Sequence, residues 1–274
     1  MIIISSRRTF DDPDNLSTDG HHIREIDLAN NSVVRDLTMP NLIAQIQGKK
    51  VLVLVHGYNN EQFEVYDAYQ IIEDKVQALT PGAYDFVIGY SWPGGDRGLE
   101  WWQGKSRANA VARLFHSLIE EMSNSAAFVD LMSHSLGARV SLKALKESQV
   151  QAVVRNYFCT APAVDNECLE VGEEFSEAVP SCGRLFVFHS ARDGVLRVSY
   201  EAAEWDRALG LYGPEDKDYI SRKARTIYVA NCKKIVGNHG GYKRADAVYK
   251  YIGAYQTVDL AIFLWTPGSL SGLP

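Results

Sequence analysis

The sequence has few cysteines, no long hydrophobic run and no excess of positive charge. Its 274 residues include four cysteines without a CxxC pair, Cys159, Cys168, Cys182 and Cys232. This pattern favours reduced thiols over a disulfide framework, with a Cys168–Cys182 bridge as the alternative for an exported protein. Lys and Arg number 28 against 34 Asp and Glu, giving a net charge of −6. Nucleic-acid binders usually carry a basic surface, so we expect no nucleic-acid partner.

Signals for export, membrane insertion and metal binding are also missing. The apolar residues 2–4 precede two arginines, whereas a signal peptide has the reverse order and a longer apolar region. The apolar run at 260–265 is too short to span a bilayer. His21 and His22 are adjacent rather than spaced as metal ligands, and no Walker or dinucleotide glycine pattern occurs. We therefore expect a cytoplasmic protein without a membrane span, metal or cofactor; the sequence leaves its oligomeric state open.

Short apolar runs alternate with longer amphipathic patterns. Residues 51–55 form a β-branched run without alternation, as expected for a strand buried on both faces. Further strands are predicted at 86–90, 127–132, 152–158, 185–188 and 226–230, and helices at 63–79, 101–122, 136–145 and 245–252. The alternation predicts an α/β fold, a mostly parallel doubly wound sheet with helices on both faces. The inserts at 163–183 and 205–224 are too short for a large cap domain.

The whole chain, residues 1–274, is predicted to form one domain. Residues 1–50 are expected to supply loops and additional edge strands near 2–4 and 23–26. Residues 51–255 form the core that carries the chemistry, and residues 256–274 form a C-terminal tail.

A candidate nucleophile follows the predicted strand 127–132. The segment Ser133-His134-Ser135-Leu136-Gly137 leads into a helix. A sharp strand-to-helix turn lifts a serine hydroxyl above the sheet and places it at a helix N-terminus, whose positive partial charge favours a developing oxyanion. Gly137 supplies one of the small residues that such a turn needs, and Ser133 stands where glycine is usual. The alternative is that Ser135 only caps the helix.

The turn after residue 55 reads His56-Gly57-Tyr58-Asn59. A glycine there lets backbone N–H groups point at a substrate carbonyl oxygen, so the N–H groups of Tyr58 and Leu136 are the predicted oxyanion hole. Gly57 and His134 are expected to border the substrate, and for His56 we favour a structural role. Trp92, after the strand at 86–90, is expected to wall the substrate pocket.

Two further strand ends carry an acid and a base. Asp193 follows the strand at 185–188, and His239 lies in the Gly-rich loop after 226–230. We predict that His239 is the general base and that Asp193 orients it. Asp165 is the competing acid, and His189 and His134 are weaker candidates for the base. Asp130 is excluded, because five residues of extended strand separate it from Ser135, about 16 Å.

These motifs resemble the α/β-hydrolase superfamily, and especially a largely uncharacterised bacterial branch of predicted serine esterases. The resemblance covers roughly residues 50–255. Its motifs are His56–Asn59, Ser91-Trp92-Pro93, Ser133–Gly137, Ala161-Pro162-Ala163-Val164-Asp165 and His239-Gly240-Gly241-Tyr242. The chain order Ser135, Asp193, His239 is that of the α/β-hydrolase triad.

The resemblance implies hydrolysis of carboxylic esters through an acyl-enzyme, without a cofactor, on a small-molecule substrate. The motifs leave other acyl bonds open, as in a thioesterase, an amidase or a phospholipase. A non-catalytic interaction protein is disfavoured, because such proteins typically lose a triad member and all three candidates are present.

Overall fold

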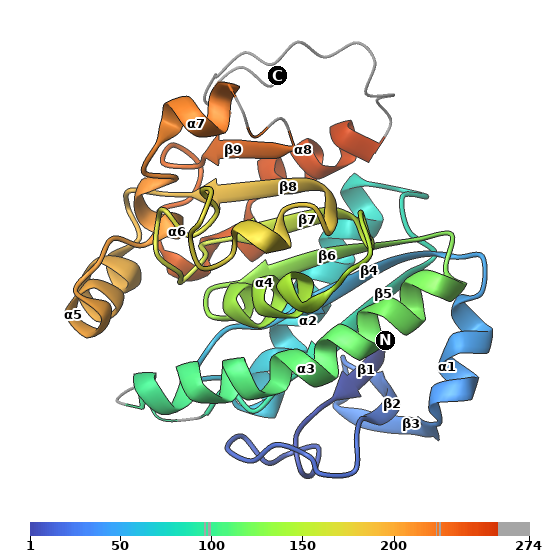
Figure 1. Ribbon diagram of the computed structural model, residues 1–274. Helices are drawn as coiled ribbons and strands as arrows, with labels where there is room; N and C mark the ends of the chain where they lie inside the picture. Colours follow the sequence, from blue (N-terminus) through green and yellow to red (C-terminus); the bar gives the residue numbers. More distant parts are fainter. Residues whose placement is uncertain (96, 98–99, 223, 225, 257–274) are drawn as a thin grey trace.

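The computed structural model describes residues 1–95, 97, 100–222, 224 and 226–256 (Figure 1). Within these residues, nine strands form one sheet in the order β3-β2-β1-β5-β4-β6-β7-β8-β9. β1 pairs antiparallel with β2, and β2 with β3, whereas all other neighbours are parallel. The predicted mostly parallel sheet is confirmed. The strands are β1 Ile2–Ser5, β2 His22–Asp27, β3 Ser32–Leu37, β4 Lys50–Val55, β5 Phe86–Ser91, β6 Phe128–His134, β7 Val154–Thr160, β8 Cys182–His189 and β9 Ile227–Asn231.

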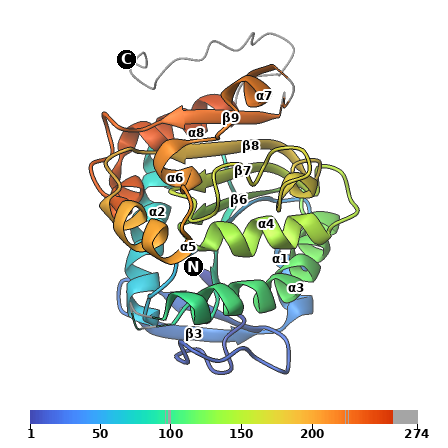
Figure 2. The same ribbon diagram turned by 60° about the vertical axis from the view of Figure 1, so that its left-hand side comes forward.

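Helices cover both faces of the sheet, as predicted. α3 (Trp101–Ser125) packs beside α4 (Gly137–Glu147) on one face, and α2 (Gln62–Leu79) lies with α8 (Asp246–Gln256) on the other (Figures 1 and 2). The predicted bounds of these four helices were right to within a few residues. The remaining elements are α1 Met39–Ile46, α5 Glu201–Glu204, α6 Leu209–Tyr212, α7 Lys217–Arg222, η1 Ser176–Ala178, η2 Leu196–Tyr200 and η3 His239–Arg244.

The inserts after β7 and β8 form only short helices in the described residues, and no separate cap domain is built from them. In the same residues, no helix has the length and apolar character needed to cross a membrane. The four cysteines are buried and unpaired, so Cys168 and Cys182 are not bridged. The predicted C-terminal tail lies outside the described residues, except Gln256, which ends α8.

The N-terminal strands differ from the prediction in position. β1 lies inside the sheet, between β2 and β5, rather than near its edge. Its residues Ile2–Ile4 are at most 5% exposed, which fits a strand covered on both faces. The edge is formed by β3, which we did not predict, and whose Val33 and Val34 are 51% and 59% exposed.

The strand order reverses beside β4. The chain passes from β4 to β5 on one side through α2, and then crosses over α3 to β6 on the other side of β4. In open α/β sheets, ligands bind in the crevice outside the carboxyl ends of the strands at such a reversal. The turns after β4 and β6 are the segments in which the sequence placed Tyr58 and Ser135.

Candidate active site

Ser135 lies in the turn between β6 and α4 with φ of 55°, in the left-handed region that non-glycine residues rarely adopt. Three backbone hydrogen bonds hold it there. Its N–H donates to Thr160 O over 3.1 Å, and its carbonyl accepts from the N–H groups of Ala138 at 3.0 Å and Ala163 at 3.2 Å. Such strain persists only where the surroundings fix it, and it clusters at functional sites.

The turns after β4 and β6 touch each other through two glycines. A Cβ atom at Gly137 would lie 2.4 Å from the carbonyl oxygen of His56, so only glycine fits there. A Cβ atom at Gly57 would lie 3.0 Å from Cβ of Ser135. The requirement for a small residue, inferred from the sequence for Gly137, therefore has a steric cause, and Gly57 borders Ser135.

Ser133 replaces the usual glycine without disturbing the turn. It is 1% exposed, and its hydroxyl shares a 2.7 Å hydrogen bond with the hydroxyl of Tyr157 on β7. Because Tyr157 supplies a polar partner inside the sheet, the hydroxyl of Ser133 is not left unpaired, which would be costly in a buried position.

Asp193 and His239 meet at the same sheet edge. His239 Nδ1 donates to Asp193 Oδ2 over 2.7 Å, and the N–H of Leu196 donates to Asp193 Oδ1 over 3.0 Å. The hydroxyl of Ser190 donates to Val236 O over 2.8 Å and ties the two loops together. With its proton held at Nδ1, neutral His239 has its lone pair at Nε2.

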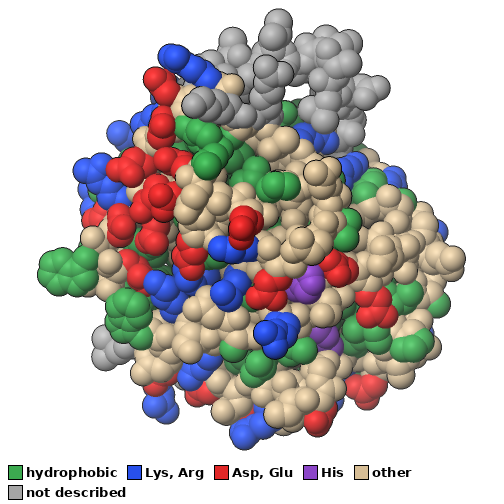
Figure 3. Space-filling view, viewed as in Figure 1, with side chains coloured by type: hydrophobic (Ala, Val, Ile, Leu, Met, Phe, Trp, Pro, Cys, Tyr) green, Lys and Arg blue, Asp and Glu red, His purple; other side chains and the backbone are tan. Residues whose placement is uncertain are grey.

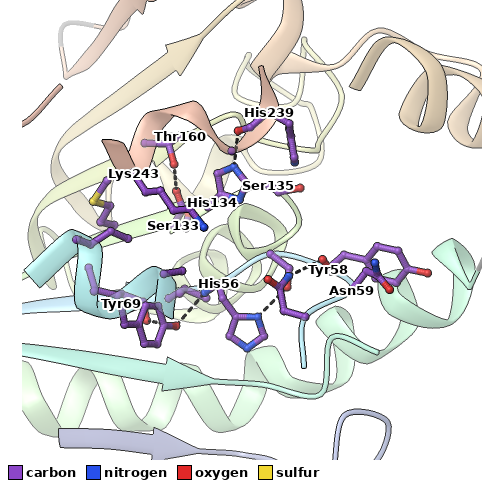
Figure 4. Close-up of a pocket in the computed structure, with 18 residues that line it drawn as sticks. His56, Tyr58, Asn59, Tyr69, Ser133, His134, Ser135, Thr160, His239 and Lys243 are labelled. Atoms are coloured by element: carbon purple, nitrogen blue, oxygen red, sulfur yellow. Dashed lines mark hydrogen bonds between the residues drawn. The ribbon is translucent and has the colours of Figure 1, made fainter. Parts of the chain in front are cut away.

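His239 and Ser135 line one cavity, and in Figure 4 the imidazole of His239 lies beside the Ser135 hydroxyl. Among the described side chains, no hydrogen bond joins Ser135 Oγ to the His239 ring. Catalytic hydrogen bonds are often long in ligand-free enzymes and tighten when substrate binds, so the geometry is compatible with proton transfer. Asp193 is fully buried, whereas the His239 side chain is 17% exposed.

The predicted oxyanion donors are free. Within the part of the chain that the structure describes, the backbone N–H groups of Tyr58 and Leu136 donate to no partner. Leu136 directly follows Ser135, and Tyr58 directly follows Gly57, the residue that touches the Ser135 turn. Unpaired N–H groups at this point are available to a carbonyl oxygen of a ligand.

The other histidines considered as bases are buried, which disfavours their protonated form. Burial lowers the pKa of His134 to about 3, and its Nε2 donates to the carbonyl of His239 over 2.9 Å. Burial likewise lowers the pKa of His189 to about 4. His56 accepts from the N–H of Trp92 at Nε2 over 3.1 Å and donates from Nδ1 to Gly57 O over 2.8 Å, which fits the structural role that we favoured.

Three further residues do not line the cavity: the predicted Trp92, the competing acid Asp165, and Asp130, which was excluded on sequence grounds. Trp92 was expected to wall the pocket, but it is fully buried, stacks on His56 with ring centroids 5.5 Å apart, and donates from Nε1 to His56 O over 2.7 Å. Asp165 accepts from the hydroxyl of Tyr200 on η2 over 2.5 Å. The carboxylate of Asp130 pairs with Arg155. Of the candidate acids, only Asp193 reaches His239.

The cavity has a volume of about 260 Å³ and extends from the Ser135 turn between the sheet and α2. Its lining includes two residues that the sequence analysis missed, Tyr69 and Lys243. The hydroxyl of Tyr69 donates toward Tyr90 O at 2.6 Å and Leu54 O at 2.9 Å and accepts from the N–H of His56 at 3.0 Å. It thereby fixes the ends of β4 and β5. No cluster of metal-ligating side chains occurs in the described residues.

Comparison with solved structures gave matches of low identity. The ydeN gene product from B. subtilis is 18% identical over 75% of this chain and 98% of its own, with a TM-score of 0.41. Esterase PE8 is 14% identical over 76% and 92%, with a TM-score of 0.42. A Pyrococcus furiosus esterase is 12% identical over 77% and 80%, with a TM-score of 0.40. The search of curated proteins found no match.

A family model gives the assignment that these distant structures do not. The model described as an alpha/beta hydrolase of unknown function (DUF900) matches residues 35–250, which include the turns that carry Tyr58, Ser135, Asp193 and His239. The chain therefore belongs to this family of alpha/beta hydrolases and is a hydrolase by family.

Proposed function

We propose that the protein hydrolyses carboxylic esters through an acyl-enzyme on Ser135. His239 Nε2 takes the hydroxyl proton while Oγ attacks the carbonyl carbon of the ester, and the N–H groups of Tyr58 and Leu136 bind the oxyanion. The intermediate collapses, the C–O bond to the alcohol breaks, and His239 returns the proton to the leaving oxygen. His239 then takes a proton from a water molecule, whose oxygen attacks the acyl carbon. The C–Oγ bond breaks, the acid leaves, and His239 returns the proton to Ser135 Oγ.

The observation that carries this proposal is the 2.7 Å hydrogen bond between Asp193 and His239 at the cavity that Ser135 lines. A buried carboxylate on Nδ1 holds the imidazole in the tautomer that can accept a proton at Nε2. It also stabilises the imidazolium that forms after the proton is taken. The left-handed backbone of Ser135 and the free N–H groups of Tyr58 and Leu136 support the same roles.

The test is covalent labelling with a fluorophosphonate probe, combined with hydrolysis of p-nitrophenyl esters of graded acyl length. Wild-type protein should be labelled at Ser135, and Ser135→Ala should lose the label and at least about 10⁴-fold of its kcat/KM. Ser117→Ala, an exposed hydroxyl on α3, is the matched control and should keep both. Full esterase activity in Ser135→Ala, or no label on wild-type protein, would rule the mechanism out.

The same machinery could act on thioesters, amides or phospholipid esters, because all of them pass through a similar tetrahedral intermediate. Substrates with one acyl group and different leaving groups would rank these bonds. If the folded protein neither reacts with the probe nor turns over any acyl bond, the non-catalytic interaction protein becomes the better explanation.

A further inference from the structure

Lys243 is a cationic side chain in the cavity to which the proposed mechanism gives no task. It lies on η3, four residues after His239, and lines the same cavity as Ser135. Figure 4 shows its side chain extending from η3 toward His134 and Ser133. Burial chiefly lowers the pKa of His134, and the positive charge of Lys243 also contributes.

The ammonium group has unused hydrogen-bonding capacity. Among the described residues, the ammonium group of Lys243 forms no ion pair and no hydrogen bond; its backbone carbonyl accepts from the hydroxyl of Tyr249 over 3.0 Å. Its pKa is lowered chiefly by partial burial and then by Arg244, whereas Asp67 and Glu64 on α2 raise it. Neither carboxylate lies within 4.0 Å of the Lys243 ammonium group, so neither forms an ion pair with it. Holding a half-buried cation without a partner is unfavourable, so a ligand anion would gain by pairing with it.

The rest of the protein offers no general attraction for anions. Acidic residues outnumber basic ones by 34 to 28. On the face in Figure 3, acidic side chains gather at the upper left, and basic side chains lie scattered around and below them rather than in one patch. An anionic ligand therefore depends on a local cation. The cavity that Lys243 lines also has apolar wall residues, Leu54 and Met132 from the sheet and Ile72 from α2.

We propose that Lys243 binds an anionic group of the substrate. The preferred substrates are then esters that carry a carboxylate or phosphate group, separated from the ester bond by a short apolar segment. This inference rests on the proposed function of Ser135. Lys243 acts here as a specificity-determining residue, because it contacts the substrate at a distance from the bond that breaks.

The first experiment compares matched esters. The mono-4-nitrophenyl ester of glutaric acid and 4-nitrophenyl pentanoate have acyl chains of equal length and differ in the terminal carboxylate. A second pair, 4-carboxyphenyl acetate and 4-methylphenyl acetate, places the carboxylate on the alcohol side. In at least one of the two pairs, Lys243→Ala should lower kcat/KM about tenfold for the anionic ester. For the neutral ester of the same pair, kcat/KM should change less than about twofold.

Two variants provide controls. Lys243→Arg keeps the charge and should keep the preference for the anionic ester. Arg244→Ala removes an exposed charge from the adjacent position and should behave as wild-type protein. If Lys243→Ala slows anionic and neutral esters alike, or if wild-type protein shows no Lys243-dependent preference in either pair, the inference is wrong while the proposed esterase function stands.

A second measurement does not need turnover. Glutarate or inorganic phosphate should raise the thermal midpoint of wild-type protein and of Arg244→Ala, but not of Lys243→Ala, because a ligand stabilises only the state that binds it. The two anions distinguish a carboxylate site from a phosphate site. If no ester is hydrolysed and Ser135 is unlabelled, the thermal midpoints still test the anion site. Stabilisation by the anion that depends on Lys243 supports the site, and the absence of such stabilisation overturns the inference.

Discussion

Asp130 and Asp193 are both fully buried carboxylates, and they serve different parts of the molecule. Asp130 lies toward the amino end of β6 and accepts hydrogen bonds from several donors. These are Arg155 Nε at 3.0 Å and Nη2 at 2.6 Å, the backbone and side-chain N–H groups of Asn156 at 3.0 Å, and the hydroxyl of Tyr84 at 2.8 Å. These partners neutralise the charge and join β6 to β7 and to the loop before β5.

Asp193 has fewer partners, and one of them leads to a cavity. One carboxylate oxygen accepts from the N–H of Leu196, and the other accepts from His239, whose ring reaches the pocket beside Ser135. Burial of a carboxylate therefore does not by itself indicate a catalytic role. What distinguishes Asp193 is a partner with a second, proton-accepting atom on the cavity side.

Asp193→Asn is expected to have the largest effect, a loss of kcat. An amide at this position can donate to Nδ1 and so favours the tautomer with its proton on Nε2, which cannot accept the Ser135 proton. We expect kcat to fall about 10⁴-fold, with the fold retained by circular dichroism. Asp165→Asn, at the competing acid, is the matched control and should keep kcat within a few-fold. A large loss in Asp165→Asn with full activity in Asp193→Asn would reverse the assignment of the acid.

Asp130→Asn tests the other half of the comparison. The substitution removes the charge that pairs with Arg155, while the side chain keeps its shape. Removing one partner of a buried pair is strongly destabilising, and because the Arg155 side chain is 30% exposed we expect a loss of about 3 kcal/mol in unfolding free energy. Urea unfolding measures it. The kcat of the folded fraction should be unchanged, and a selective loss of kcat at wild-type stability would contradict the distinction.

Sequence patterns predicted the centre of the fold better than its margin. The run Val51–Val55 is buried on both faces, and both its β-branched composition and its lack of alternation indicate this burial. β3 is harder to predict, because Val33 and Val34 are exposed and the strand depends on pairing with β2. Tertiary pairing of this kind leaves little trace in local sequence.

The candidate site could be predicted where each residue follows a strand end. Chain order and the parallel sheet sufficed to nominate Ser135, Asp193 and His239, and in the structure Asp193 accepts a hydrogen bond from His239; their catalytic roles remain predictions. Trp92 was misjudged, because an aromatic residue after a strand can turn into the core as easily as into a pocket. Lys243 was missed because nothing local distinguishes a lysine that lines a cavity from a solvated one.

The smallest expected effect extends the comparison from buried acids to a buried base, His56. Burial lowers the pKa of His56 to about 3, well below the value of about 6.5 in an unfolded chain. Between these two values the unfolded chain binds a proton that the folded chain does not, so stability is full above pH 6.5 and falls as the pH drops below it. From pH 7 to pH 5, this one residue should cost about 2 kcal/mol.

Urea unfolding at pH 7, 6 and 5 separates this contribution. His56→Gln should be less stable than wild-type protein at pH 7, because it loses the hydrogen bonds to Trp92 and Gly57. It should nevertheless lose about 2 kcal/mol less than wild-type protein on going to pH 5, since glutamine does not titrate. His116→Gln, on the partly exposed side of α3, is the control. It should lose as much unfolding free energy between pH 7 and pH 5 as wild-type protein does. Parallel losses in wild-type protein and His56→Gln would mean that His56 is protonated in the folded state at pH 5, and its buried ring would then be paired differently from the arrangement described here.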